Sequence, residues 1–541
     1  MLRGILTVGG WTMASRLLGF ARDILIAAFA GTGPVADAFF VANKLPNLFR
    51  RLFGEGAFNA AFVPEFSGLL AAEGRPAAEQ FATEAIGVMT FWLGLLTVLG
   101  EIFMPALLVV LAPGFTAVPA KFALAVTLTR ITYPYLLLIC LAALLSGVLN
   151  GLHRFAAAAA APLLYNTVSI LAMLLLTPHV PTVGHALAWG VSISGVLQLA
   201  LLAVAVRRAG IRLYVPRPRL TPQMRLLLRR MGPGLIGAGA TQLNQAVDVI
   251  IASLLPAGTV SLLYYAERVY QLPLGTIGVA VGTAILPVLS RQVRGGEAAA
   301  AVDTLNRALE FALFLTIPAA LALAISAEPI MWVLFGRGAF THANAVLSAQ
   351  ALAAYALGLP AYVLLKVLAP AFFARGDTAT PVKVGMATLA LNLALNLALM
   401  VPLRHVGPPL ATSLAAWFNA GALTVMLRRR GFLATDAQLR RRVPRMALAA
   451  AAMGVTLALL QGPLFAHADL ARGLRWAALA VLVISGGLAY AVAGQVLGGF
   501  DLRAMVPRRL ARRERAGREE SAAPQGLPPQ GLPSRGVPSG E

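Results

Sequence analysis

The sequence predicts an all-α integral membrane protein of about fourteen transmembrane helices, built as two parallel six-helix lobes around a central cavity plus two extra C-terminal helices. Three observations support this fold class. The 541 residues are 58% hydrophobic and 12% charged, whereas a soluble chain has about 25% charged residues. Long apolar segments recur along the whole chain. Two distant stretches also share one order of polar, aromatic and proline positions.

The distribution of apolar residues sets the predicted spans. A transmembrane helix needs roughly 20 consecutive, mostly apolar residues, and the first, second and eighth segments are the least apolar of those that qualify. In order, the predicted spans are 4–30, 37–69, 84–112, 122–149, 156–178, 184–206, 230–255, 259–289, 306–335, 343–373, 380–402, 407–427, 446–465 and 473–497.

The distribution of arginine predicts the orientation. Arginine is abundant in the connections 207–230 and 428–445, whereas the connections 31–36, 178–184 and 255–260 contain neither Lys nor Arg. Because cytoplasmic loops carry an excess of Lys and Arg, both termini are expected in the cytoplasm. The net charge of +22 could also indicate nucleic-acid binding, but the arginines flank apolar segments instead of covering one polar domain. No nucleic acid is therefore expected as a partner.

These features divide the chain into five parts. Spans one to six form an N-terminal lobe at 1–206, and spans seven to twelve form a C-terminal lobe at 230–430. A basic cytoplasmic linker at 207–229 joins them, and 431–497 contains the last two spans. The tail at 498–541 is rich in charge and then in Pro, Gly and Ser, so it is predicted to be disordered. Its arginines either contact anionic lipid or only set the orientation.

Signals for a metal, a cofactor or catalysis are missing from the sequence. The single cysteine, Cys140, lies in an apolar stretch and is expected to be a small core residue. The six histidines show no metal-ligand spacing, so neither a metal site nor a cofactor is expected. No Walker loop, serine nucleophile motif or paired-carboxylate site appears either, which argues against an enzyme.

An internal repeat relates the first two spans to the seventh and eighth. The matched positions are Asp23 with Asp248, Phe39-Phe40 with Tyr264-Tyr265, and Leu45-Pro46 with Leu272-Pro273. Six spans separate the two copies, so both copies have the same orientation, and a substrate site is expected between the halves. The alternative is chance similarity between apolar sequences, which the shared order of polar and proline positions disfavours.

Ionisable residues lie within the predicted spans of both halves. Such residues are costly at membrane depth and usually face a water-filled cavity. They are Arg16, Arg22 and Asp23 in span one, Asp37, Lys44, Arg50, Arg51 and Glu55 in span two, Asp248 in span seven, and Glu267 and Arg268 in span eight. The alternative is that the cations reach a headgroup layer or pair with Asp23 and Asp37, and this alternative weighs most for Lys44 and Arg51.

The spacing within SRLLGFARD at 15–23 favours a cavity-facing Arg16. Arg16, Gly19 and Asp23 share one helical face. Arg22 lies about 240° round an ideal helix from Arg16, so both line one cavity only if the wet surface is wide or the helix kinks near Gly19.

The sign of the buried charge predicts the substrate class. A cavity for cationic drugs should concentrate carboxylates, by electrostatic complementarity. Arginines predominate here instead, and guanidinium groups bind phosphate oxygens with matched geometry. An amphipathic anion such as a lipid diphosphate is the predicted substrate.

Five stretches closely resemble one known family. They are SRLLGFARD, ADAFFVANKLPNLFRRLFGEGAFNAAFVP, LYYAERVYQLPLG, GTAILPVLS and RGDTATPVK. Together they resemble the MurJ (MviN) family of bacterial lipid II flippases, within the multidrug/oligosaccharidyl-lipid/polysaccharide exporter superfamily. The resemblance covers residues 1 to about 497 in order.

The resemblance implies a transporter without enzymatic chemistry. Two lobes would rock around a cationic cavity and move lipid II, the undecaprenyl-diphosphate-linked disaccharide-pentapeptide, from the cytoplasmic to the periplasmic leaflet for peptidoglycan assembly. A monomer in the bacterial inner membrane is expected, with peptidoglycan-synthesis proteins as candidate partners. The last two helices resemble a pair that forms a groove for the lipid tail.

The resemblance also implies the site. The family's functional arginines fall on Arg16, Arg22, Arg50 and Arg268, and an acid in span two falls on Asp37. The predicted substrate-binding set is Ser15, Arg16, Arg22, Asp23, Asp37, Arg50, Glu267 and Arg268.

Departures from the family keep other functions open. Gln271 stands where some members have Glu. Phe373 stands where a sodium-binding member would have Asn, so no sodium site is predicted although Asp248 and Asp377 match acidic positions.

A cation-coupled multidrug exporter of the same superfamily is the alternative within transport. A scaffold of the wall-synthesis complex is the alternative from another class.

Overall fold

The structure is a computed structural model that describes residues 2–51, 57–466 and 472–500. Every regular element within these residues is a helix, which confirms the predicted all-α membrane fold. Among the described residues, ten helical segments are long and apolar enough to cross a membrane, and one of them, 379–429, contains two long helices. The number fourteen remains a prediction. Glu55 and most of the predicted tail, 501–541, lie outside the described residues.

The N-terminal half folds into helices that end close to the predicted span boundaries. Proline lies in the first turn of α2, α4, α5 and α6, where its missing N–H has no intrahelical partner to lose. The elements are α1 (Leu2–Ala30), α2 (Pro34–Phe49), α3 (Ala57–Ala72), α4 (Arg75–Ile102), α5 (Met104–Leu111), η2 (Pro113–Ala117), α6 (Pro119–Thr132), α7 (Tyr135–Gly151), α8 (Phe155–Leu176), η3 (Thr177–His179) and α9 (Val183–Arg208).

The C-terminal half begins after an extended basic linker at 211–221. Its elements are α10 (Pro222–Ser253), α11 (Thr259–Arg294), α12 (Ala298–Ile325), α13 (Ala327–Phe335), α14 (His342–Ala356), α15 (Leu359–Phe373), α16 (Ala379–Leu403), η4 (Arg404–Val406), α17 (Gly407–Arg429), α18 (Ala437–Phe465) and α19 (Arg472–Val496).

Helix interruptions occur at equivalent places in the two halves. The third and fourth predicted spans of the N-terminal half are each two helices in series, α4 with α5 and α6 with α7. The corresponding spans of the C-terminal half are interrupted in the same way, as α12 with α13 and α14 with α15. Shared breaks of this kind are independent of side-chain similarity, so they support the internal repeat. The second spans differ, because α11 continues through Pro273 while its counterpart contains α2 and α3.

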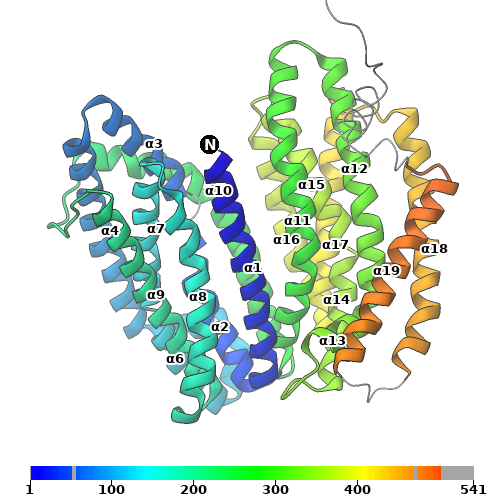
Figure 1. Ribbon diagram of the computed structural model, residues 1–541, viewed down its shortest axis with the longest axis horizontal. Coiled ribbons are helices and arrows are strands. Elements are labelled where there is room, and N and C mark those ends of the chain that lie inside the picture. Colours follow the sequence, from blue (N-terminus) through cyan, green and yellow to red (C-terminus); the bar gives the residue numbers. More distant parts are fainter. Residues whose placement is uncertain (1, 52–56, 467–471, 501–541) are drawn as a thin grey trace, which may run out of the picture.

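The two halves form two lobes that meet at one end of the molecule (Figure 1). At this closed end lie the connections 31–33, 254–258 and 336–341, and the lobes diverge toward the opposite, basic end, which has the N-terminus and the connections 209–221 and 430–436. Helix α10 contacts both lobes, through α3 on one side and α16 on the other. Helices α18 and α19 pack together on the outside of the C-terminal lobe, with α18 against α12.

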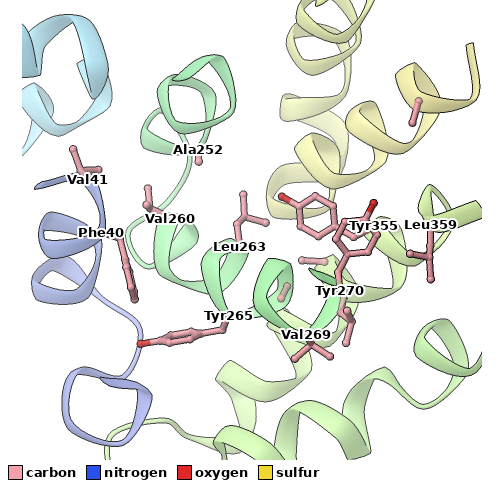
Figure 2. Packing of buried hydrophobic residues seen from close by; sticks show 14 of the residues in the cluster. Phe40, Val41, Ala252, Val260, Leu263, Tyr265, Val269, Tyr270, Tyr355 and Leu359 are labelled. Atoms are coloured by element: carbon pink, nitrogen blue, oxygen red, sulfur yellow. The ribbon is translucent and has the colours of Figure 1, made fainter. Parts of the chain in front are cut away.

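Aromatic residues from the two repeat copies pack together at the closed end. Phe40 of α2 stacks on Tyr264 of α11, with ring centroids 3.9 Å apart, and meets Tyr265 edge-on at 5.5 Å. Figure 2 shows Phe40 and Tyr265 reaching toward each other from α2 and α11. Each aromatic pair of this kind contributes about 0.5–1.5 kcal/mol beyond its area burial. The positions that the repeat aligns are therefore in contact across the boundary between the lobes.

Candidate functional site

Asp23 links the lobes through a buried ionic cluster. Its Oδ2 accepts a hydrogen bond from Arg268 Nε at 2.5 Å, and its Oδ1 accepts from Arg22 Nη2 at 2.7 Å and from the Tyr264 hydroxyl at 3.1 Å. Asp23 is 1% exposed. Arg22 and Asp23 lie on α1, whereas Tyr264 and Arg268 lie on α11. One carboxylate thus neutralises only one of two guanidinium groups, and the cluster retains a net positive charge.

Arg22 is buried in this cluster. Its guanidinium carbon lies 5.1 Å from the centre of the Tyr165 ring of α8, a cation–π contact. Helix α1 is continuous across Gly19, which packs against the side chain of Asn166. The small size of Gly19 therefore serves close packing between α1 and α8.

Asp37 of α2 caps the N-terminus of α11 in the other lobe. Its carboxylate accepts hydrogen bonds from the backbone N–H groups of Gly258 at 2.7 Å and Ser261 at 2.9 Å, and from the Ser261 hydroxyl at 2.8 Å. Lys121 of α6 completes the shell, with Nζ 2.7 Å from Asp37 Oδ2. The first N–H groups of a helix lack intrahelical partners and attract anions. A carboxylate from another helix satisfies them here.

Backbone contacts complete the closed end. The Ala339 N–H donates to the Ala28 carbonyl at 2.8 Å, and the Tyr265 hydroxyl donates to the Gly31 carbonyl at 3.0 Å. Gly31 and Gly338 adopt positive φ angles, and a Cβ atom on either one would collide with backbone across this boundary. Only glycine permits this approach.

Arg16 differs from Arg22 because its charge is exposed. Its guanidinium lies beside Gly275 of α11, and within the described parts of the chain it forms no hydrogen bond or ion pair. Arg16 lies near the middle of α1, which is a predicted span, and a cation at membrane depth without a carboxylate partner is costly and points to a functional role. Arg16 is therefore available to an anion between the lobes.

The other predicted cations of span two lie at the basic end of α2. Arg50 Nε donates to the side chain of Asn47 at 3.1 Å, within the same helix. Arg51 Nη1 donates to the side chain of Gln245 at 3.2 Å and so connects the segment that follows α2 to α10. These contacts orient both guanidinium groups, and the part of Arg50 in substrate binding remains a prediction.

Ser15 and Glu267 use their polar atoms on neighbouring residues. The Ser15 carbonyl accepts from Asn166 Nδ2 at 2.9 Å, and the Ser15 hydroxyl lies 3.3 Å from the same nitrogen. Glu267 accepts from Gln271 Nε2 at 2.7 Å, one helical turn away. The predicted substrate contacts of both residues remain predictions.

The two acids considered for a cation have different environments. Asp248 of α10 faces Asn392 of α16, with 3.5 Å between the carboxylate and the amide nitrogen. Asp377 lies between α15 and α16, where it accepts from Thr380 and pairs with Arg430 at 2.5 Å. The Thr380 hydroxyl and N–H, followed by Arg430, lower the pKa of Asp377 below its usual range. No group of three or more His, Cys, Asp or Glu side chains forms a metal site within the described residues.

Two functional candidates were missed by the sequence analysis. Lys366 of α15 is exposed, lies over Gly278 and Gly282 of α11, and forms no ion pair within the ranges described. The signal was present, since Lys366 is the single charged residue of an otherwise apolar helix. Lys121 was also visible in the sequence, but nothing there indicated that it pairs with Asp37.

The arrangement suits a large anion that binds between lobes closed at one end. Comparison with known protein families shows which kind of protein has this arrangement. The family described as "Lipid II flippase MurJ" matches residues 26–468. The chain belongs to this family. The sequence-based resemblance to MurJ is thereby confirmed.

Curated relatives of the MurJ family match most of the chain. The "Probable lipid II flippase MurJ" of Rhizobium meliloti (strain 1021) is 46% identical over 461 residues, which cover 84% of this chain and 86% of the relative. The protein of the same name from Rhizobium tropici is 42% identical over 519 residues, which cover 95% of this chain and 97% of the relative.

Solved structures agree with this placement. "Lipid II flippase MurJ, inward closed conformation" superposes with a TM-score of 0.75 at 26% identity and covers 90% of this chain and 98% of that one. An inward-facing multidrug resistance MATE family transporter of the MOP superfamily gives a TM-score of 0.60 at 15% identity, covering 79% of this chain and 97% of its own. The second similarity shows the fold alone. The chain is a multi-pass membrane protein.

Proposed function

We propose that this MurJ-family protein is a lipid II flippase that moves the undecaprenyl-diphosphate-linked precursor of peptidoglycan from the cytoplasmic to the periplasmic leaflet. The observation that carries the proposal is the pairing of Asp23 with Arg268 across the lobes, beside the exposed and unpaired Arg16. This arrangement supplies both an anion site and a link that the anion could open. Membership of the family supports the choice of lipid II as that anion.

The substrate competes with Asp23 for Arg268 and Arg22, and this competition couples substrate binding to closure of the lobes. A diphosphate has several acceptor oxygens and more negative charge than one carboxylate, so it competes with Asp23 for the two guanidinium groups. Their transfer to the substrate removes the Asp23–Arg268 ion pair, which joins α1 to α11, and the Arg22–Asp23 pair within α1. A ligand shifts a conformational equilibrium only by its difference in affinity between the two states. The transfer of these arginines provides that difference.

Arg16 and Lys366 assist substrate binding from opposite lobes. Arg16 lies on α1 of the N-terminal lobe and Lys366 on α15 of the C-terminal lobe, and neither has an ion-pair partner among the described residues. Both can therefore attract the diphosphate without first breaking an internal pair. Their binding energy is available before the Asp23 cluster opens.

Asp37 forms the second link that the cycle must break. Opening of the closed end removes Asp37 from the N-terminus of α11 and exposes Gly258 and Ser261 N–H groups. Water can hydrate those groups at a membrane surface, so loss of the cap costs about 0.5–2 kcal/mol. This moderate cost is compatible with a reversible gate.

The basic end is cytoplasmic, both termini are cytoplasmic, and the membrane is the bacterial inner membrane, as the arginine bias of the connections supports. The protein acts as a monomer without enzymatic chemistry, and α18 with α19 provides a groove for the lipid tail. Peptidoglycan-synthesis proteins are the candidate protein partners.

A cation-coupled multidrug exporter is the competing function. The similarity to MATE transporters extends to the fold, whereas Arg16 of α1 and Lys366 of α15, which are exposed and lie beside α11, are cations. A site for cationic drugs would need the opposite charge.

Complementation of cells depleted of their own flippase tests the proposal. The wild-type chain should restore growth, and Arg16→Ala and Arg268→Ala should fail although both variants reach the membrane. Arg229→Ala, which removes an exposed charge from the start of α10, is the matched control and should restore growth. Growth supported by both cavity variants would refute the site, and growth supported by a transport-inactive variant would favour a scaffold.

A further inference from the structure

A cavity lies at the basic end of the C-terminal lobe, away from the Asp23 cluster. It is open to one side, has a volume of about 650 Å³ and is lined by α12, α15, α17, α18 and the connection between α17 and α18. This volume falls within the range of roughly 300–1,000 Å³ that is typical of small-molecule sites. Its apolar wall consists of Leu309, Leu313, Leu364, Leu433, Leu439 and Val443.

Pro444 explains why α18 leaves space here. Proline inside a helix has no N–H to donate to the carbonyl four residues earlier, and its ring displaces that turn. Pro444 lies within α18 and lines the cavity. The helix therefore does not close the space between itself and α17 with a regular, tightly packed turn.

An ionic network fixes the wall of the cavity. Arg307 of α12 pairs with Asp436 at the start of α18, and Arg442 pairs with Glu310 at 2.5 Å. Asp436 also caps α18, because its side chain accepts from the Leu439 N–H at 2.7 Å. The cavity is thus a defined feature of the fold.

The mouth of the cavity is positively charged, and the neighbouring acids do not balance this charge. Arg428 and Arg440 line it and are both exposed. Arg440 Nε donates to the Thr435 hydroxyl at 3.2 Å, and the side chain of Arg428 forms no hydrogen bond or ion pair within the part of the chain that is described. The neighbouring acids, Glu310 and Asp436, are already paired with Arg442 and Arg307. An apolar interior beneath two available guanidinium groups matches an amphipathic anion.

We infer that this cavity binds an anionic glycerophospholipid from the leaflet at the basic end, with one acyl chain among the leucines and the phosphate between Arg428 and Arg440. Basic pockets between transmembrane helices on the cytoplasmic side are suited to anionic headgroups. The walls come from the membrane-crossing parts of α12, α15 and α17, so a lipid reaches them directly from the bilayer. A zwitterionic headgroup would bring its own cation toward the arginines, which disfavours it.

The bound lipid would join α18 to the lobe. Its chain contacts α12 and α15, while its phosphate spans Arg428 at the end of α17 and Arg440 at the start of α18. The two outer helices would then be anchored by lipid as well as by the ionic network. The inference does not depend on the transported substrate.

Lipid retention by the purified full-length chain tests this inference. The protein is delipidated in detergent, titrated with dioleoyl phosphatidylglycerol and examined by native mass spectrometry. The Arg428→Gln/Arg440→Gln double variant should retain the lipid on the order of tenfold less well. The control is Arg429→Gln/Arg441→Gln, which removes the same charge from adjacent exposed positions that do not line the cavity. Equal losses in the two double variants would overturn the inference.

A second variant and two further ligands separate the remaining explanations. Leu313→Trp should fill the cavity and lower retention of phosphatidylglycerol while thermal unfolding of the protein remains cooperative. Unchanged retention in this variant would show that the acyl chain lies elsewhere. Glycerol 3-phosphate that binds as tightly as the lipid would identify a soluble-anion site, and displacement of the lipid by undecaprenyl phosphate would assign the cavity to the transport path. Either result would contradict the inference.

Discussion

Asp37 of α2 caps the first turn of α11 across the lobe boundary, with its carboxylate 2.9 Å from the Ser261 nitrogen. The same carboxylate pairs with Lys121 of α6, so one buried side chain joins three helices. The Asp23 cluster joins α1 to α11 across the same lobe boundary. Both links lie toward the closed end, and this placement makes closure dependent on two carboxylates that the substrate or water must replace.

Loss of the Asp37 charge should weaken closure. In Asp37→Asn the amide oxygen still accepts a hydrogen bond from α11, but Lys121 loses its ion-pair partner, and removal of one member of a buried pair costs about 3–5 kcal/mol. Disulfide formation between Ala28→Cys and Ala339→Cys, whose backbones are hydrogen-bonded, reports closure. The yield should fall relative to the same cysteine pair with Asp37 present. An unchanged yield would show that Asp37 does not hold the lobes together.

Asp23→Asn should disable the protein more severely than its small effect on side-chain packing would suggest. The asparagine leaves Arg22 buried and Arg268 partly buried without a carboxylate, a cost of about 3–5 kcal/mol. Growth complementation should fail and the cysteine cross-link at the closed end should decrease. Asp23→Glu retains the charge and should restore part of both signals. Full activity of Asp23→Asn would contradict the proposed link.

Gly338→Ala should prevent closure by sterics. The added Cβ would collide with the Ala28 carbonyl of the opposite lobe, and φ is +57° at this position. Gly376→Ala provides a matched control, because Gly376 has φ of +76° and nothing lies within 4 Å of the added Cβ. Both variants bear the backbone strain of about 1–2 kcal/mol, but Gly338→Ala alone should abolish the cross-link. Equal effects of the two substitutions would attribute the loss to strain.

Arg16 and Lys366 should contribute to substrate affinity without affecting closure. Arg16→Lys keeps the charge but loses the planar guanidinium fork, and Lys366→Gln removes a charge. Binding of lipid II to the purified protein should weaken roughly tenfold in each variant, corresponding to about 1.4 kcal/mol. The cross-link at the closed end should remain at the wild-type yield. A fall in the cross-link without loss of binding would place these residues in the gate.

Much of the fold could be predicted from the sequence because hydrophobicity and repeats act over long segments. The apolar runs predicted spans of the right length. The parallel repeat and the family followed from motifs that contain polar positions such as Asp23 and Asp248. The breaks at Phe103 and Ser326 were not predicted, since an apolar run has the same hydropathy whether its helix is continuous or interrupted.

The residue types of the site were predicted, and the pairing of Arg22 with Asp23 was foreseen as an alternative, but the contacts between the lobes were not. Asp23 and Arg268 were singled out as charges at membrane depth, yet their pairing depends on the packing of α1 against α11, which one sequence does not contain. The partners of Asp37 were hidden for the same reason, because Ser261 N–H is a backbone group with no side-chain signature. Lys366 was overlooked although its isolation in an apolar helix was visible.

Accessibility of lipid II at the outer face of the membrane tests the central claim most directly. Cells depleted of their own flippase are made to express the wild-type chain or Arg268→Ala, and lipid II exposed to the periplasm is cleaved by an enzyme that cannot enter the cytoplasm. The proposed function predicts cleavable lipid II with the wild-type chain and loss of most of it with Arg268→Ala. Equal cleavage in cells with and without the wild-type chain would contradict the assignment.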